Sequence, residues 1–214
     1  MPKETIGLFP LKLVLFPESF FPLHIFENKF IELINNNIVY KTPFGINLRV
    51  ASRTYDVGCL TEVINITKKY DDGRMDIVVL GLSRYKIYNI RIGESGYSIG
   101  DAEPYEDIPE IINPALLLKC IETFNLISDT VTSVKIEKIF TANLKTSIPS
   151  FLIAQKAGLS NIQKQELLES KSENERLYML LKHLENILPI VRDSEFSANL
   201  IKNDGYIQSK QFPK

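Results

Sequence analysis

The chain of 214 residues lacks tryptophan and contains only two cysteines, Cys59 and Cys120. Two cysteines so far apart form neither a disulfide framework nor a zinc motif, so we expect both to be small apolar core residues. No segment approaches the roughly 20 apolar residues that a membrane-spanning helix needs. Prolines and a lysine interrupt the one N-terminal stretch that resembles a secretion signal. These absences predict a soluble, cytoplasmic protein.

An excess of either charge is also missing. The chain has 25 lysines and arginines against 26 aspartates and glutamates, a formal net charge of -1. A surface that neutralises phosphates normally shows a basic excess, so nucleic acid is not expected as the main partner. Lys68, Lys69 and Arg74 nevertheless cluster around one turn. This local cluster keeps RNA binding open as an alternative.

Catalytic and metal-binding motifs are absent as well. None of the ten glycines is followed by lysine, which excludes a phosphate-binding loop of the G-x-x-x-x-G-K-[ST] type, and no G-x-S-x-G motif is present. His24 and His183 have no acidic or cysteine neighbour at metal-ligand spacing. We interpret His24 as a core or rim residue and His183 as a solvated one. The sequence therefore predicts no enzyme activity, no metal and no cofactor.

Up to about residue 103, the sequence has the pattern of short strands. Strands are expected at 5–9, 20–25, 44–50, 57–67 and 75–81. The Asp72-Gly73 pair is typical of a hairpin turn between the last two. In "SRYKIYNIRI", residues 83–92, the inward-facing apolar positions change from Tyr85 and Ile87 to Tyr88, Ile90 and Ile92. Such a change predicts a β-bulge near Ile87.

One short helix is expected among these strands. In "NKFIELINNN", Phe30, Leu33 and Ile34 have helical spacing. Asn28 is the predicted N-cap, and the three asparagines at 35–37 are predicted to end the helix. Glu27, just before it, is better placed to cap free backbone amides than to act in catalysis.

Beyond the proline-rich and acidic segment 101–114, the periodicity is helical. Helices are predicted from Pro114, over 131–144, and up to Gly158, and the pairs Ser160/Gln163 and Ser172/Glu175 form two capping boxes. The last helix carries a leucine stripe that we expect to pack within its own bundle and to end at Pro189; its members are Leu177, Leu181, Leu184 and Leu188. The predicted organisation is a barrel over 1–103, a linker over 104–114, a helical bundle over 115–190 and a mobile polar tail over 191–214.

The opening segment "LFPLKLVLFPESFFPLHIFENKF", residues 8–30, contains Phe-Pro three times. Together with "YDVGCLTEV" (55–63), "DGRMDIVVLGLSRYKI" (72–87) and "KQELLE" (164–169), it resembles the Lon protease N-terminal domain family in the expected order. The likeness covers roughly residues 6–188. It implies an α+β fold, in which a PUA-like pseudo-β-barrel precedes a C-terminal helical bundle.

The resemblance assigns roles to particular residues. On that fold each Phe-Pro closes a strand and places its ring in the core, and Pro22, Glu27, Gly58 and Gly81 occupy structural family positions. "PESFF" lacks the glycine common after "LFP" in this family, so we expect that loop to differ in shape. The ATPase and Ser-Lys protease domains of Lon proteases are missing from this sequence, so we expect a stand-alone member, and no proteolysis follows from the likeness.

The implied function is a non-catalytic module that binds unfolded or tagged polypeptides or partner proteins. Candidate contact residues are aromatic side chains near turns: Phe20, Tyr40 and Tyr55. RNA binding remains an alternative because PUA-like barrels also occur in RNA-associated proteins. A small-molecule sensor with a pocket between barrel and bundle is a third possibility.

Overall fold

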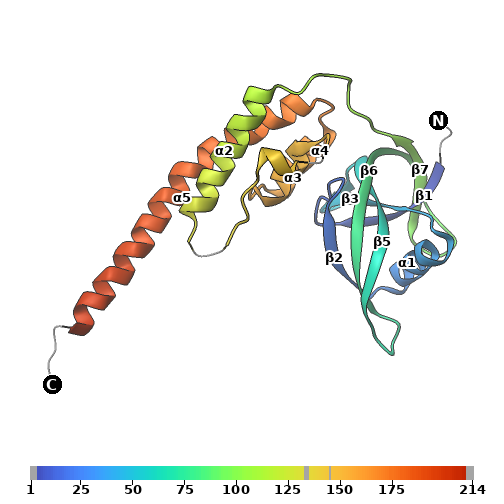
Figure 1. The fold of residues 1–214 in the computed structure, drawn as a ribbon. Coiled ribbons are helices and arrows are strands. Elements are labelled where there is room, and N and C mark those ends of the chain that lie inside the picture. The colour runs from blue at the N-terminus through green and yellow to red at the C-terminus, as the bar shows by residue number, and fades with distance from the viewer. Residues whose placement is uncertain (1–3, 133–134, 145, 211–214) are drawn as a thin grey trace. The chain divides into compact units, whose positions relative to one another are not determined.

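The computed structural model describes residues 4–132, 135–144 and 146–210, with side chains described up to Ser194. The chain forms two compact units (Figure 1). The first comprises Met1–Pro109 and Leu159–Ser172, and the second comprises Glu110–Gly158 and Glu173–Lys214. Strands occupy the N-terminal part and helices dominate the C-terminal part, which confirms the predicted α+β class. The predicted domain boundaries themselves stay a prediction.

The first unit is a curled sheet with two helices. Its elements are β1 (Glu4–Leu11), β2 (Phe20–Ile25), α1 (Asn28–Tyr40), β3 (Phe44–Val50), β4 (Arg53–Thr54), β5 (Val57–Lys69), β6 (Met75–Ile92), β7 (Ser98–Pro104) and α4 (Asn161–Glu169).

Five of these strands close into a ring. The sheet order is β1-β7-β6-β5-β3, and β1 also pairs with β3 in parallel, which joins the two ends. The strand β2 lies outside the ring and pairs with β6. Closure removes most exposed sheet edges and encloses an apolar core. Residues from β1, α1, β3, β5 and β6 fill that core, among them Phe9, Ile34, Phe44, Cys59 and Val79.

The three Phe-Pro pairs differ in their surroundings. The rings of Phe9 and Phe16 are buried as expected, but Phe21 is 37% exposed, so its predicted place in the core is wrong. Phe21 lies at the start of β2, and β6 is the one strand that pairs with β2 among the described strands. Pro22 follows on the same strand, and an edge strand can accommodate a residue without an N–H donor.

The hairpin at Gly73 is confirmed, since Tyr70 N–H donates to the Arg74 carbonyl at 2.9 Å. The predicted bulge is also present, but it lies between Tyr88 and Arg91, where β6 slips against β7. The expected inward direction of Tyr88, Ile90 and Ile92 is wrong, because all three are exposed. The strand β6 continues to Ile92, but Ile87 is its last buried residue.

The helix α1 begins at Asn28 with Glu27 at the N-cap position, so the predicted Asn28 cap is wrong. The Glu27 side chain makes no capping hydrogen bond; its carboxylate instead lies 3.1 Å from Lys29 Nζ. The asparagines do not end the helix either, because it continues to Tyr40. Asn37 is buried and bonds to neighbouring backbone, so tertiary contacts override its tendency to stop a helix.

The second unit consists of α2 (Pro114–Thr130), the 3₁₀ turn η1 (Thr141–Asn143), α3 (Pro149–Lys156) and α5 (Glu173–Lys210). The helix predicted over 131–144 is wrong in the part that the structure describes. The described part of that segment has no regular structure apart from η1, and Asn125 on α2 exchanges two hydrogen bonds with the Ile139 backbone at 2.7 and 2.9 Å. These bonds occupy the N–H and the carbonyl that Ile139 would use within a helix.

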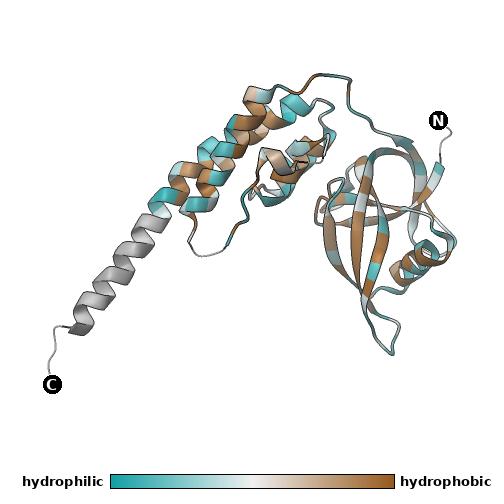
Figure 2. Cartoon of the chain, viewed as in Figure 1, coloured by the Kyte–Doolittle hydropathy of each residue, from teal (hydrophilic) through white to brown (hydrophobic). Residues whose placement is uncertain are grey.

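The helix α5 packs along α2 (Figures 1 and 2). Leu177, Leu181 and Leu184 are buried and Leu188 is half-buried, so three of the four leucines of the predicted stripe pack inside their own unit. The helix continues through Pro189, so the predicted end there is wrong. A proline removes one helical hydrogen bond, and the residues after it resume the helix. Residues 211–214 of the predicted tail lie outside the described residues.

A buried polar cluster joins α3 to α5. The Glu173 carboxylate accepts hydrogen bonds from Ser150 N–H at 2.7 Å and from Ser150 Oγ at 2.6 Å. Arg176 lies 2.6 Å from the same carboxylate and packs over the Phe151 ring. Burial raises the pKa of Glu173, and the bonds from Ser150 and the Arg176 charge oppose that rise. The carboxylate caps the start of α3, a structural role.

Candidate functional site

The sheet of the first unit exposes apolar side chains on its outer surface. Along β6, Met75, Ile77 and Val79 are buried, so the alternate residues point outward. Cross-strand pairs place Phe20 beside Leu80 and Pro22 beside Val78. We define the outer face as the exposed or half-buried residues Phe20, Pro22, Ile64, Val78, Leu80 and Leu82.

Exposure on this face is high for residues so apolar. Phe20 is 64% exposed, Ile64 45% and Leu82 38%. They come from three neighbouring strands, because β6 pairs with β2 on one side and with β5 on the other (Figure 2). A scattered apolar residue on a surface is ordinary, but a contiguous group on one sheet face is typical of a binding surface.

A tight loop positions Phe20 at the start of β2. Glu18 N–H donates to the Gly81 carbonyl at 2.8 Å, and Gly81 N–H donates to the Ser19 carbonyl at 2.9 Å. A Cβ on Gly81 would lie 2.2 Å from the Phe16 carbonyl oxygen, so only glycine fits under the loop. Glu18 has a φ of 60°, in the left-handed region that glycine favours. Here glutamate adopts the backbone conformation for which a glycine would be suited.

Gly58 also lies under close contacts. A Cβ there would come within 2.5 Å of the Ile46 carbonyl oxygen. Asn47 beside it accepts a hydrogen bond from Tyr85 and donates one to the Tyr55 carbonyl at 3.0 Å. Burial raises the pKa of the Tyr85 hydroxyl, which therefore stays protonated as a donor. These contacts support structural roles for Gly58 and Gly81.

Polar groups border the outer face where β2 ends. His24 Nδ1 lies 2.5 Å from Asp76 Oδ1, and Tyr70 donates to the other carboxylate oxygen at 2.9 Å. The hydrogen bonds from His24 and Tyr70 lower the pKa of Asp76. His24 is exposed and lies at the rim, which was one of the two placements predicted for it. Phe26, 61% exposed, stacks beside this pair.

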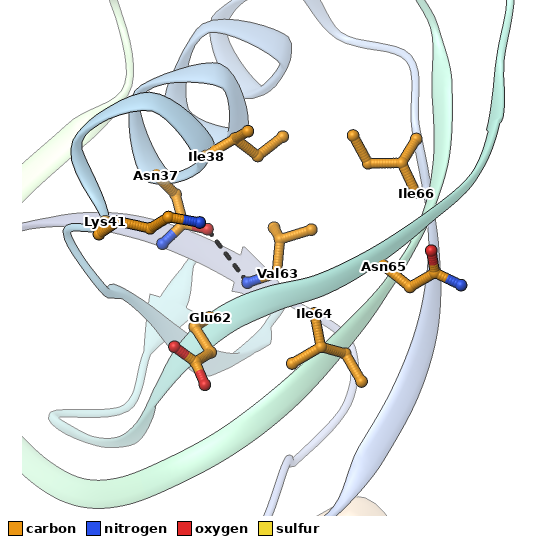
Figure 3. Close-up of a pocket in the computed structure, with 8 residues that line it drawn as sticks. All are labelled: Asn37, Ile38, Lys41, Glu62, Val63, Ile64, Asn65 and Ile66. Atoms are coloured by element: carbon orange, nitrogen blue, oxygen red, sulfur yellow. Dashed lines mark hydrogen bonds between the residues drawn. The ribbon is translucent and has the colours of Figure 1, made fainter.

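A pocket of about 340 Å³ lies at the edge of β5, beneath the end of α1, and Ile64 of the outer face is among the residues that line it (Figure 3). Val63 and Ile66 from β5 and Ile38 from α1 supply its apolar surface. Lys41 and Glu62 lie at its polar end. The pocket therefore combines an aliphatic floor with charges of both signs.

The three predicted contact residues lie on different elements. Phe20 belongs to the outer face, Tyr40 is 70% exposed at the end of α1, and Tyr55 is half-buried below the Arg53 guanidinium, 4.6 Å from its ring centroid. None of them lines the α1–β5 pocket. Our sequence reasoning missed Val78, Leu80 and the other members of the outer face. The available signal was the run "IVVLGL" (77–82), which contains no polar side chain and fills both faces of a strand.

The basic cluster near Gly73 is partly neutralised. Arg74 pairs with Asp72 at 2.7 Å, and Lys68 Nζ lies 4.4 Å from the centroid of the Tyr70 ring. Acidic residues thus accompany the basic ones in this hairpin, unlike a phosphate-binding patch.

Groups suited to metal binding do not assemble in the described part of the chain. No three metal-ligating side chains come together there. Both cysteines are buried and free, as expected, and burial raises the pKa of each thiol to about 12. A thiol that stays protonated is a poor nucleophile. Among the described helices, none combines the length and the hydrophobicity needed to cross a membrane.

Residues 5–186 match a family model of a substrate-binding domain, which gives the class of this chain. The family is the ATP-dependent protease La (LON) substrate-binding domain, and the chain belongs to it. This confirms the resemblance seen in the sequence. The match covers the whole barrel and the helices up to the middle of α5.

Two solved structures share the fold. One is the Lon N-terminal domain protein from Xanthomonas campestris, with a TM-score of 0.67, 20% identity, and coverage of 84% of this chain and 98% of that one. The other is the N-terminal domain of the Mycobacterium avium complex Lon protease, with a TM-score of 0.59, 16% identity, and coverage of 85% and 98%. No curated protein matches the chain.

Proposed function

We propose that the chain is a non-catalytic module that binds polypeptides with exposed apolar segments, such as unfolded proteins, through its outer face. The observation that carries this proposal is the exposure of Phe20, Ile64 and Leu82 on three adjacent strands. A polar border and an apolar centre are the usual anatomy of a protein-binding surface.

Energetics favour Phe20 as the main contact. Burying an exposed phenylalanine side chain contributes about 1.5–3 kcal/mol, and about 1.4 kcal/mol corresponds to a tenfold change in affinity. Aromatic side chains also lose few rotamers on binding. Leu82 and Ile64 on the same face add aliphatic contact area.

A binding titration tests the proposal. The probe is fluorescein-labelled, reduced and carboxymethylated α-lactalbumin, and the measurement is fluorescence anisotropy. We expect the double variant Phe20→Ser with Leu82→Ser to bind at least about tenfold more weakly than the wild type, since two apolar contacts are lost. Ile92→Ser is the matched control, because Ile92 is 71% exposed on β6 but lies outside the outer face.

Circular dichroism melting curves check that each variant is folded. Unchanged binding by a folded double variant would exclude the outer face. The same titration with Tyr40→Ala and Tyr55→Ala decides whether these two predicted contacts take part.

A further inference from the structure

The strand β5 has an edge that its neighbours leave open. It runs from Val57 to Lys69, but β3 pairs with it only over Cys59–Thr61. Beyond Thr61, β6 is the only strand that pairs with β5 in the part of the chain that the structure describes. Apart from the Val63 N–H, which donates to Asn37 Oδ1, the backbone donors and acceptors along this open edge of β5 are therefore placed to pair with a further strand.

At one position on this edge, a side chain accepts the backbone hydrogen bond that a neighbouring strand would otherwise accept. Asn37 Oδ1 accepts a hydrogen bond from Val63 N–H at 3.0 Å, and Asn37 Nδ2 donates to the Thr42 carbonyl at 2.6 Å. Asn37 is only 5% exposed, so packing holds its amide in this orientation. The bond shows that the Val63 amide points away from β6, toward the open side.

The pocket beside this edge suits a side chain from an added strand. Side chains of an extended segment alternate, so those facing α1 would meet Ile38, Val63 and Ile66 (Figure 3). Lys41 and Glu62 both line the pocket, and Lys68 and Lys69 follow on β5, where Asp76 is the cross-strand partner of Lys68. Three lysines against two carboxylates leave one excess positive charge, which favours a segment that carries carboxylates.

We propose that the open edge of β5 binds an extended polypeptide segment as an added strand, with an aliphatic side chain in the α1–β5 pocket and an acidic side chain near Lys41. This inference rests on the proposed function and narrows its substrate class to extended segments that mix aliphatic and acidic residues. Register shifts in β5 between Val63 and Asn65 and between Ile66 and Lys68 keep the added strand short. Such bulges also prevent open-ended pairing between copies.

Backbone methylation provides a sharp test. The probe is a short fluorescein-labelled peptide of alternating valine and aspartate, and its two control forms are N-methylated at either the odd or the even residues. The two forms have the same composition, but only one of them removes the N–H groups that face β5. We expect that form to bind at least about tenfold more weakly, and the other to bind like the parent peptide. Equal binding by the two methylated forms overturns the proposal.

Charge reversal gives a second readout. Lys41→Glu should weaken binding of the parent peptide about three- to tenfold at low salt, and Lys29→Glu, near the start of the same helix, should not. Equal effects of the two variants contradict the assigned position of the carboxylate.

The two proposals can fail separately. Suppose that the two methylated peptides bind equally well, while the Phe20 and Leu82 double variant loses binding of the unfolded protein. That result excludes the strand-addition proposal and leaves the outer-face proposal intact. If the double variant still binds the unfolded protein, the outer-face proposal is excluded instead.

Discussion

At the scale of single residues, Gly81 is tightly constrained by the backbone of a neighbouring loop. The loop from Phe16 to Ser19 lies directly on it, and two backbone hydrogen bonds fasten the loop there. Phe20 follows immediately, so the loop determines where the outer face begins. The resemblance drew attention to Gly81, but the sequence did not show which atoms exclude a side chain.

Gly81→Ala should destabilise the first unit. The new methyl group would lie 2.2 Å from the Phe16 carbonyl oxygen, so the loop must move, at a cost of about 1–3 kcal/mol. Urea denaturation measures the change. Gly93→Ala is the control, since its Cβ would meet the Ile99 side chain at 3.2 Å. Equal losses in both variants would contradict the assigned contact.

The hydrogen bonds to Asp76 predict a pH effect. They hold the pKa of this carboxyl below its usual value of 3.8 in the folded chain, so the contribution of Asp76 to stability is present above pH 3.8 and is lost as the pH falls through the folded pKa. Replacing His24 with alanine should raise the pKa of Asp76, because His24 supplies the largest lowering effect. Carboxyl carbon NMR titration measures it, and an unchanged pKa contradicts the assignment.

At the scale of elements, periodicity located most helices and strands, whereas their ends depended on tertiary contacts. Ser160 and Gln163 form the capping box that the sequence predicted at the start of α4. By contrast, Asn37 extends α1, and Asn125 prevents a helix near Ile139. Asparagine thus occurs inside one helix and beside a segment that is not helical, and in each case its bonding partner is distant in the sequence. Local patterns do not contain that information.

Leu181→Asp should strongly destabilise the second unit. Leu181 is 6% exposed on the face of α5 that packs within this unit, and the change removes about 2 kcal/mol of apolar burial and adds a charge without a partner. Ile190→Asp, at a site 66% exposed on the same helix, should leave the melting temperature nearly unchanged. An unchanged sharp transition in Leu181→Asp would show that this face is free to bind another protein.

At the scale of the whole molecule, the fold class and the family could be inferred from the sequence, but the closure of the ring could not. Closure depends on the parallel pairing of Leu8–Leu11 with Gly45–Leu48, and no local pattern marks two strands so far apart as partners. The outer face was missed for a related reason, since Val78 and Leu80 face outward only because Met75–Val79 alternate over a core on one side. Of the three predicted contact residues, Phe20 is the one that belongs to the outer face.

The helix α4 shows the same dependence on distant contacts. Its residues lie between the two segments of the second unit in sequence but pack with the first unit, where Gln165 donates to the Val57 carbonyl at 3.0 Å and Asn161 donates to the Lys12 carbonyl at 2.7 Å. The chain therefore enters the second unit at Glu110, returns at Leu159 and leaves again at Glu173.

Each compact unit contains one shielded sulfur atom, Cys59 in the first and Cys120 in the second. An alkylating reagent can reach either thiol only when its own unit opens, because both are 0% exposed. The alkylation rate of each cysteine, followed by mass spectrometry of the two modified peptides, therefore measures how often its unit opens, without an added dye or tag. If a bound polypeptide slows alkylation of Cys59 and leaves Cys120 unaffected, the barrel half is the one it holds closed.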